Sequence, residues 1–303
     1  MSEEFDQVLG SKLYESLLCE KCLLGCPLGI NIPNMIIEAR KFFVKKFGPP
    51  SFLTKMLKNL NSSGNVFISK KRTVGVPFKK GRDVLFKGCI ESAFLREDLK
   101  YVRRILDKFN YSYTEIINER CCGYVLEKLG FNNASKIYKE NYKMFKDIEA
   151  KRIITICPEC FEAFKERYPS IIKEFKFKVL SIIDVLLEIF EKAISLMGGL
   201  DLEVVYIKSN KEVDKKALEL LGKMPKLKVL DEVDGVRCYG INNVNLSLAM
   251  NIIKSSVSNL IKSKKFVFVS SSPINVYLFK KALKKYPVAI GSVSELFSLA
   301  LGI

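Results

Sequence analysis

Histidine is absent from this 303-residue chain. Its absence excludes catalytic triads and dyads that use an imidazole base, and also histidine-ligated zinc, Rieske clusters and histidine-ligated haem. Long apolar runs are missing too: none reaches the roughly 18–20 uncharged residues of a membrane span. The most apolar stretch, residues 179–190, contains Asp184 and Glu188 and is expected to be a buried or amphipathic helix. Because the chain has no histidine, any metal must be bound mainly by sulfur.

Acidic residues are scarce relative to basic ones, with 33 Asp and Glu against 50 Lys and Arg and a net charge of +17. Nucleic-acid binding is one interpretation. We favour a lysine-rich surface spread over many helices, which suits an acidic partner or anionic clusters. The N-terminal stretch MSEEFDQVLG is acidic and lacks the apolar core of a signal peptide. We therefore expect a soluble, cytoplasmic protein, and in that reducing compartment grouped cysteines indicate metal or redox chemistry.

The chain divides into three parts by pattern. Residues 1–47 have a helical pattern, Gly48-Pro49-Pro50 breaks it, and residues 48–82 are a basic, turn-rich connector. Strand signals then alternate with helical ones, which predicts an open, largely parallel α/β sheet. The expected strands are 83–87, 111–117 and 151–156, and the expected helices are 91–109, 133–148 and 158–167. The predicted domains are 1–81, 82–197 and 198–303.

Five cysteines follow these strands: Cys89, Cys121, Cys122, Cys157 and Cys160. Because the carboxyl ends of parallel strands meet at one edge of a sheet, we expect the five thiols to converge there. A tetrahedral zinc or a cubane cluster takes four thiols. The fifth thiol indicates a cluster of another shape or a spare redox thiol. Cys157 is expected at a helix N-cap, because Pro158 suits the first turn.

The last third of the chain repeats this pattern with fewer cysteines. Residues 202–208 resemble the first strand, Arg237-Cys238-Tyr239-Gly240 echoes Arg120-Cys121-Cys122-Gly123, and residues 266–275 echo 152–160. The counterparts of the missing thiols are Ser209, Tyr239, Ser272 and Asn275. We predict two tandem α/β repeats, the second degenerate and structural, with Cys238 an inert remnant. Chance similarity of short strand–turn–helix pieces is the alternative.

The segments VLFKGC, CCG and ITICPECFEAFKERYP resemble the cysteine-rich CCG domain of the heterodisulfide reductase family. That family includes the B-type and D-type chains of heterodisulfide reductases and the iron–sulfur subunits of anaerobic glycerol-3-phosphate, glycolate and lactate dehydrogenases. The resemblance covers residues 82–190 well and 201–303 as a worn copy. It implies that Cys89, Cys121, Cys122, Cys157 and Cys160 ligate an unusual 4Fe–4S cluster. In the reductases such clusters cleave disulfides, and in the dehydrogenases they transfer electrons.

A second group of cysteines lies near the N-terminus. Cys19-x2-Cys22-x3-Cys26-Pro27 resembles the ferredoxin run C-x2-C-x2-C-x3-C-P, with Ser16 where the first cysteine would stand. The resemblance implies a small helical ferredoxin-like domain before the two repeats. Three alternatives are open. The three cysteines hold a cluster with Ser16 or a non-protein ligand, they take a fourth thiol from a partner, or they are relics or a zinc half-site.

These patterns predict an iron–sulfur oxidoreductase subunit of a heterodisulfide-reductase-like complex. It would hold a 4Fe–4S cluster in the first repeat and, if the N-terminal cysteines are filled, a second cluster. Neither G-x-G-x-x-G after a strand nor G-x4-G-K-[ST] occurs, so electrons must come from a flavoprotein, ferredoxin-like or quinone-linked partner. The acceptor would be a disulfide or sulfur substrate, or a further carrier.

Two other functions are compatible with the same cysteines. A metal-free thiol–disulfide oxidoreductase could use Cys157 with Cys160, or the vicinal Cys121 and Cys122. A zinc-stabilised scaffold could bind nucleic acid or an acidic protein through its basic surface. Both predict a colourless protein, whereas an iron–sulfur protein is brown.

Overall fold

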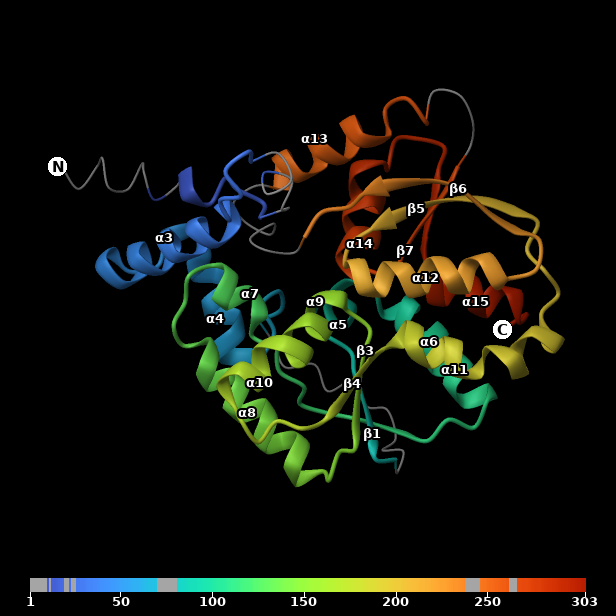
Figure 1. Ribbon diagram of the computed structural model, residues 1–303, viewed down its shortest axis with the longest axis horizontal. Helices are drawn as coiled ribbons and strands as arrows, with labels where there is room; N and C mark the ends of the chain where they lie inside the picture. Colours follow the sequence, from blue (N-terminus) through green and yellow to red (C-terminus); the bar gives the residue numbers. More distant parts are fainter. Residues whose placement is uncertain are drawn as a thin grey trace.

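Two four-stranded parallel sheets form the framework of the protein (Figure 1). The computed structural model describes residues 10, 12–18, 22, 26–69, 81–237, 246–261 and 266–303. The first sheet has the order β2-β1-β3-β4 and the second β6-β5-β7-β8, and the strand pairs within each are parallel. The strands are β1 (Asp83–Phe86), β2 (Tyr113–Glu115), β3 (Arg152–Thr155), β4 (Lys178–Ser181), β5 (Leu202–Lys208), β6 (Leu227–Asp234), β7 (Val267–Ser270) and β8 (Ala289–Ser292).

Helices connect successive strands and cover the sheets. Before the first sheet come α3 (Ile32–Phe47), the 3-10 helix η1 (Ser51–Leu53) and α4 (Thr54–Ser63). The first half contains α5 (Cys89–Phe94), α6 (Arg96–Lys108), α7 (Tyr124–Lys128), α8 (Ala134–Asp147), α9 (Pro158–Glu162), the π-helix η2 (Ala163–Arg167), α10 (Tyr168–Ile171), α11 (Ile182–Ala193) and the 3-10 helix η3 (Ile194–Leu196). The second half contains α12 (Lys211–Lys223), α13 (Leu246–Val257), α14 (Pro273–Ala282) and α15 (Val293–Ala300).

The parallel α/β class is confirmed, and the predicted strands 83–87 and 151–156 match β1 and β3 to within a residue at each end. The expected strand 111–117 is shorter, as β2. The expected helix 91–109 is wrong as a single helix, because the backbone breaks at Leu95 (φ −123°, ψ 47°) and divides it into α5 and α6. The expected helix 158–167 begins correctly at Pro158 but continues through a π-helical turn as η2.

Two further predictions about local structure are wrong. Residues 179–181 belong to strand β4, and α11 begins only at Ile182. Its start is fixed by a capping box, in which the Ser181 hydroxyl accepts from the Asp184 N–H (3.2 Å) and the Asp184 carboxylate accepts from the Ser181 N–H (2.7 Å). The connector 48–82 contains the helices η1 and α4, because residues 51–63 lack glycine and proline and bury Leu53, Met56 and Leu60.

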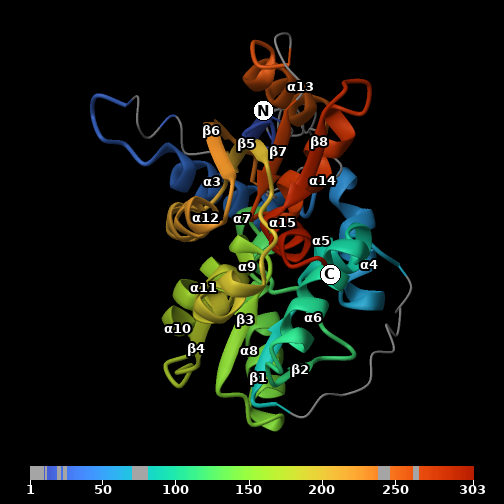
Figure 2. The same cartoon turned by 90° about the vertical axis from the view of Figure 1, so that its right-hand side faces the viewer.

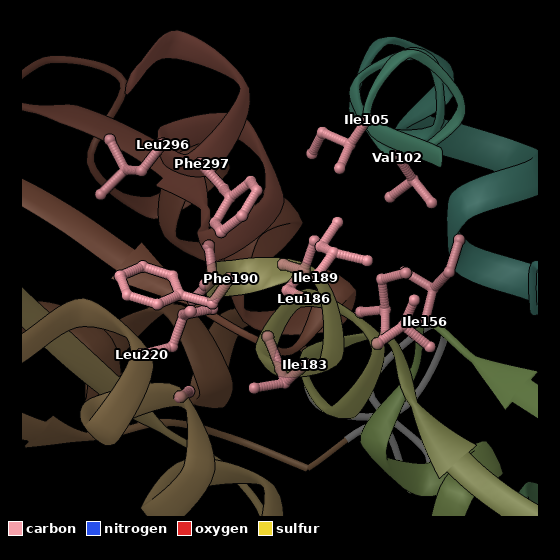
Figure 3. Packing of buried hydrophobic residues seen from close by; sticks show 14 of the residues in the cluster. Val102, Ile105, Ile156, Ile183, Leu186, Ile189, Phe190, Leu220, Leu296 and Phe297 are labelled. Atoms are coloured by element: carbon pink, nitrogen blue, oxygen red, sulfur yellow. The ribbon is translucent and has the colours of Figure 1, made fainter. Parts of the chain in front are cut away.

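The two halves share one core. Helix α15 packs on α6 and α12 packs on α11, and both views place these four helices between the two sheets (Figures 1 and 2). Figure 3 shows Phe190 of α11 beside Phe297 of α15, with ring centroids 6.5 Å apart. Both side chains are almost fully buried. Such a continuous apolar interface fixes how the second half sits over the first.

The segment before the first sheet packs into the first half. Tyr14, Ile37, Met56 and Leu60 belong to one buried cluster with residues of α7 and α8. The two sheets have the same strand order, as two copies of one repeat would have. The tandem repeat and the ferredoxin-like character of the N-terminal part stay predictions. Within the residues that the structure describes, no helix has the length and apolar character needed to cross a membrane.

Candidate functional site

The cysteines of the first half sit at the carboxyl ends of three strands. Cys89 is the first residue of α5, just after β1. Cys121 and Cys122 lie in the segment between β2 and α7. Cys157 is the N-cap of α9, as predicted from Pro158, and Cys160 lies within that helix. Figure 1 shows α5, α7 and α9 on the side of the first sheet that faces the second half.

The five thiols form a row of neighbours. Cys121 lies beside Cys89 and Cys122, and Cys160 lies beside Cys122 and Cys157, close enough for each thiol to shift the pKa of the next. The predicted convergence of sulfur atoms from three strand ends is therefore present in the structure. All five are thiols without disulfide bonds; Cys89 is half-buried, and the other four are at most 6 % exposed.

The pKa values of the neighbouring thiols Cys121 and Cys122 are shifted in opposite directions. Hydrogen bonds from Cys122 and then Cys89 hold the pKa of the Cys121 thiol well below its usual range. The same bond to Cys121 raises the pKa of Cys122, and bonds to Cys122 and Cys157, together with burial, raise the pKa of Cys160. Negative charge is thus favoured first on Cys121, with neutral thiols donating toward it. Thiolates are the form in which cysteine binds metal or acts as a nucleophile.

Residues outside the cysteine motifs brace the backbone of the site. The Cys121 N–H donates to the Gly64 carbonyl (2.7 Å), and the Asn65 amide donates to the Cys89 carbonyl (3.0 Å). On the other side, the Tyr168 hydroxyl donates to the Cys122 carbonyl (2.9 Å). The sequence did not predict these hydrogen bonds to the backbone of the cysteine segments. The stretch NSSGN was a signal for a tight turn at Gly64 and Asn65, but nothing local placed that turn against the cysteines.

Glu119 ties the first and second cysteine segments together. Its carboxylate accepts from the N–H groups of Lys87 (2.8 Å) and Gly88 (2.7 Å), directly before Cys89. Burial raises the pKa of Glu119 to about 7, against the lowering effect of the Lys87 charge and of these two N–H groups. A cavity of about 40 Å³ lies beside Cys89 and Cys121, with Glu119 and Arg120 in its wall. This cavity is the side on which a small molecule could approach the thiols.

Comparison with known proteins finds a family match that includes these cysteines. Residues 84–165, which include all five thiols, match the cysteine-rich domain family called CCG. The chain contains a CCG domain. An iron–sulfur protein of Methanococcus maripaludis, named as uncharacterized, is 25 % identical over 94 % of this chain and 59 % of its own length. The D-type chain of the dihydromethanophenazine:CoB–CoM heterodisulfide reductase of Methanosarcina acetivorans is 25 % identical over 94 % of this chain and 77 % of its own length.

Other matches reach smaller parts of either chain. The EtfAB:quinone oxidoreductase of Syntrophomonas wolfei is 26 % identical over 54 % of this chain and 26 % of its own length. The chain spans 59 % of the length of the Methanococcus maripaludis protein and 58 % of that of a second iron–sulfur relative, from Methanocaldococcus jannaschii. Among solved structures, a glutamate racemase from Francisella tularensis covers 73 % of this chain with 16 % identity and a TM-score of 0.35. Nothing about function follows from that likeness.

Two glycines let the CCG domain backbone pass close to the thiols. Gly88 has φ +84°, and a Cβ built on it would lie 3.5 Å from the Cys157 Cβ and 3.6 Å from the Cys160 Sγ. Gly123 also has φ +84°; its N–H donates to the Cys121 Sγ (3.4 Å). A Cβ there would lie 2.8 Å from the Tyr138 ring. Both positions therefore favour glycine. Gly123 is the glycine of the Cys-Cys-Gly triplet.

Substituting Gly123 with alanine is expected to destabilise the fold. The left-handed backbone alone costs about 1–2 kcal/mol for an L-residue, and the contact with Tyr138 adds to it. Urea unfolding followed by circular dichroism measures the loss. The matched control is Gly222→Ala in α12, where a Cβ meets nothing within 4 Å and helix propensity favours alanine by roughly 0.5–1 kcal/mol. Equal unfolding midpoints for the two variants would contradict this account.

The donor set of the CCG domain fits an iron–sulfur cluster. Five thiols exceed the four ligands of a tetrahedral ion, and they lie in a largely buried site in which the Gly123 N–H donates to the Cys121 Sγ. Within the part of the chain that the structure describes, no three Cys, Asp or Glu side chains are arranged as a site for one metal ion. The thiols are instead packed side by side, and Gly88 has no side chain to fill the space next to Cys157 and Cys160.

Of the three N-terminal cysteines, the structure describes Cys22 and Cys26. Cys22 is exposed and Cys26 is half-exposed, whereas Cys19 lies outside the described residues. The Ser16 hydroxyl accepts from the Leu18 N–H (3.3 Å), so that side chain is used locally. The cluster predicted for Cys19, Cys22 and Cys26 stays a prediction.

The second half has polar side chains where the first has thiols. The strand pairing places Asn210, rather than the predicted Ser209, at the position of Cys89. Asn275, in the position of Cys160, accepts from the Val236 N–H (2.8 Å) and donates to the Lys208 carbonyl (3.3 Å), so it joins the ends of β5 and β6. Cys238 lies outside the described residues. The contacts of Asn275 are those of a structural residue.

Proposed function

We propose that this chain is an iron–sulfur subunit that transfers electrons in a heterodisulfide-reductase-like complex. The observation that supports it is the row of five thiols, which come from three strand ends and meet in a buried site. Burying this many thiols side by side has no packing advantage that Val or Ala would not supply, whereas cluster ligation requires several thiols at one place. Homology to the D-type chain of heterodisulfide reductase points to the same chemistry.

In this proposal Cys89, Cys121, Cys122, Cys157 and Cys160 ligate one 4Fe–4S cluster. When bound, such a cluster supplies one-electron redox chemistry at a potential tuned by charge and solvent access. The chain's own residues hold it in place: Glu119 and Asn65 fix the backbone beside Cys89, and Gly64 and Tyr168 fix the backbone of the Cys-Cys-Gly segment. Burial of the thiols excludes water, which protects a reduced site from side reactions.

Electrons reach the chain from a partner. The relatives include a component of a reductase complex and an oxidoreductase that uses a quinone, by their names. We propose a flavoprotein, ferredoxin-like or quinone-linked donor. We propose that a small disulfide or sulfur compound would approach the thiols from the side of the cavity beside Cys89 and Cys121; without such a substrate the chain would serve electron transfer alone.

The rest of the chain supports this site. We propose a helical ferredoxin-like part (1–81), the CCG domain with its cluster (82–197) and a degenerate second repeat (198–303). Cys19, Cys22 and Cys26 would hold a second cluster, completed by Ser16, a non-protein ligand or a partner's thiol. We expect the protein to work in the cytoplasm.

Iron and acid-labile sulfide measured in anaerobically purified protein test the proposal. We expect about four iron atoms per chain, and about seven or eight if the N-terminal cysteines are also filled. The protein should be brown, with broad absorbance near about 400 nm from sulfur-to-iron charge transfer, and low-temperature EPR should show a signal in one of its redox states. A colourless preparation with no iron or sulfide would end the proposal.

A metal-free thiol–disulfide oxidoreductase is the second candidate. It is favoured by the lowered pKa of Cys121 next to the neutral thiol of Cys122, beside a cavity. The vicinal pair could form a disulfide while reducing a disulfide substrate by two electrons. This candidate predicts colourless protein, and titration with a thiol reagent would show loss of two thiols on oxidation.

A further inference from the structure

Two side chains of the second half, Arg237 and Asn210, contact Glu162 at the end of the cysteine-bearing helix α9. Arg237 follows β6, and its Nη1 lies 2.9 Å from the Oε2 of Glu162, the last residue of α9. The two side chains are only 15 % and 16 % exposed. The Tyr124 hydroxyl, directly after the Cys-Cys-Gly triplet, donates to the other oxygen of Glu162. Glu162 therefore joins two cysteine segments of the first half to a cation of the second.

This ion pair lies within electrostatic reach of the thiols. Glu162 is two residues beyond Cys160 on the same short helix. One turn earlier, the Glu159 carboxylate accepts from the Cys157 Sγ (3.1 Å). Burial raises the pKa of Glu159, and the hydrogen bond from Cys157 and the charge of Arg237 oppose that rise. Arg237 thus acts on a carboxylate that is itself bonded to a thiol of the site.

The second half contacts the other cysteine helix as well. Tyr277 of α14 stacks on Phe94 of α5, with ring centroids 4.4 Å apart. Helix α5 begins at Cys89. The aromatic contact is uncharged, whereas the contact to α9 is an ion pair. Lys280 of α14 lies 3.9 Å from Asp98, and its charge also reaches Glu91 of α5. Both cysteine helices therefore have a cation of the second half nearby, and Arg237 is paired with a carboxylate of α9.

We infer that Arg237 and Glu162 set the reduction potential of the cluster that the five thiols hold. The second half would thus tune a site to which it contributes no ligand. The inference rests on the proposed function. Reduction adds one negative charge to the cluster, so a nearby cation favours it and a nearby carboxylate opposes it. Because the pair is largely buried, solvent and salt screen its charges weakly.

If Arg237 and Glu162 tune the cluster, replacing the arginine and replacing the glutamate should shift the reduction potential in opposite directions. Arg237→Gln removes the cation and leaves Glu162 and Glu159 uncompensated, so the potential falls. Glu162→Gln removes a negative charge near the thiols, so the potential rises. A merely structural ion pair predicts loss of stability in both variants and no such opposition. Arg237→Lys keeps the charge and is expected to stay near the wild-type potential.

The experiment is a redox titration of the full chain, purified anaerobically with its cluster and followed by visible absorbance and EPR. We expect Arg237→Gln and Glu162→Gln each to change the ratio of reduced to oxidised protein roughly tenfold at a fixed potential, in opposite directions, which is about 59 mV for a one-electron couple. The double variant should return toward the wild type. The matched control is Arg152→Gln, which breaks an ion pair with Asp83 (2.8 Å) at the opposite end of β3 and should leave the potential unchanged.

Iron analysis separates the two ways in which the experiment can fail. If the wild-type chain contains no iron, the proposed function is wrong. If all variants retain iron and the two single variants leave the potential unchanged, or move it in the same direction, the tuning role is overturned. If Arg237→Gln loses its iron, its potential cannot be measured, and the other two variants carry the test. The tuning role then requires a raised potential in Glu162→Gln and a potential near the wild type in Arg237→Lys, which keeps the positive charge.

Discussion

Replacing both Cys121 and Cys122 with serine is expected to abolish iron binding by the first half. These two thiols are the centre of the row, since Cys121 lies beside Cys89 and Cys122 lies beside Cys160. The double variant keeps three thiols, fewer than the four that a cubane cluster takes. If the N-terminal cysteines are empty, iron should fall from about four atoms per chain to near zero. The absorbance near about 400 nm should be lost with it.

Serine is the substitution of choice because it nearly preserves volume in a site that is almost fully buried. The backbone contacts of this segment, including the Cys121 N–H to the Gly64 carbonyl (2.7 Å), do not involve sulfur and should persist. Circular dichroism should therefore stay close to the wild type. The single variant Cys122→Ser keeps four thiols, so we expect it to retain iron with an altered EPR spectrum.

The control for thiol loss is Cys238→Ser in the second half. Residues 198–303 contain no other cysteine, and Ser272 and Asn275 stand in the sequence where the first half has Cys157 and Cys160, so this half cannot supply a set of thiol ligands. We expect iron content and spectrum to stay unchanged. Full iron content in the Cys121→Ser/Cys122→Ser double variant would show that the cluster lies elsewhere or does not exist.

The convergence of these thiols could be predicted because it depends on strand order alone. Three strand signals, each followed by cysteine, are sufficient once the sheet is parallel, since parallel strands present their carboxyl ends at one edge. The order β2-β1-β3-β4 then puts β1, which precedes Cys89, next to both β2 and β3. Pro158 fixed the N-cap position of Cys157 by its own geometry.

The parts of the site that the sequence did not predict depend on contacts between distant segments. Gly64 and Asn65 follow helix α4, which lies in a region predicted as a connector because prolines and serines flank it. Arg237 was noted as the counterpart of Arg120, but its bond to Glu162 depends on how the two halves pack. That packing is made by α6, α11, α12 and α15, whose apolar faces carry no information about which helix each will meet.

Replacing Arg40 with methionine is expected to destabilise the protein by roughly 3–5 kcal/mol, because three buried carbonyls lose their donors. Arg40 is fully buried on α3. Its guanidinium donates to the carbonyls of Leu13 (2.9 Å), Ser16 (2.8 Å) and Lys128 (2.9 Å). It also lies over the ring of Tyr14, 4.7 Å from the ring centroid. Burial lowers the pKa of Arg40 to about 10, so it is still a cation at neutral pH.

These bonds attach the segment that leads to Cys19 to helix α7 of the CCG domain, so the loss has a local consequence. In Arg40→Met, residues 12–18 lose their anchor, and limited proteolysis should cut there before the core unfolds. Urea unfolding gives the total loss. The matched control is the neighbouring Lys41→Met, whose surface pair with Glu38 (2.7 Å) is expected to contribute no more than about 0.5 kcal/mol. Unfolding midpoints that coincide for the two variants would show that Arg40 does not anchor this segment, and that the N-terminal cysteines are positioned by other contacts.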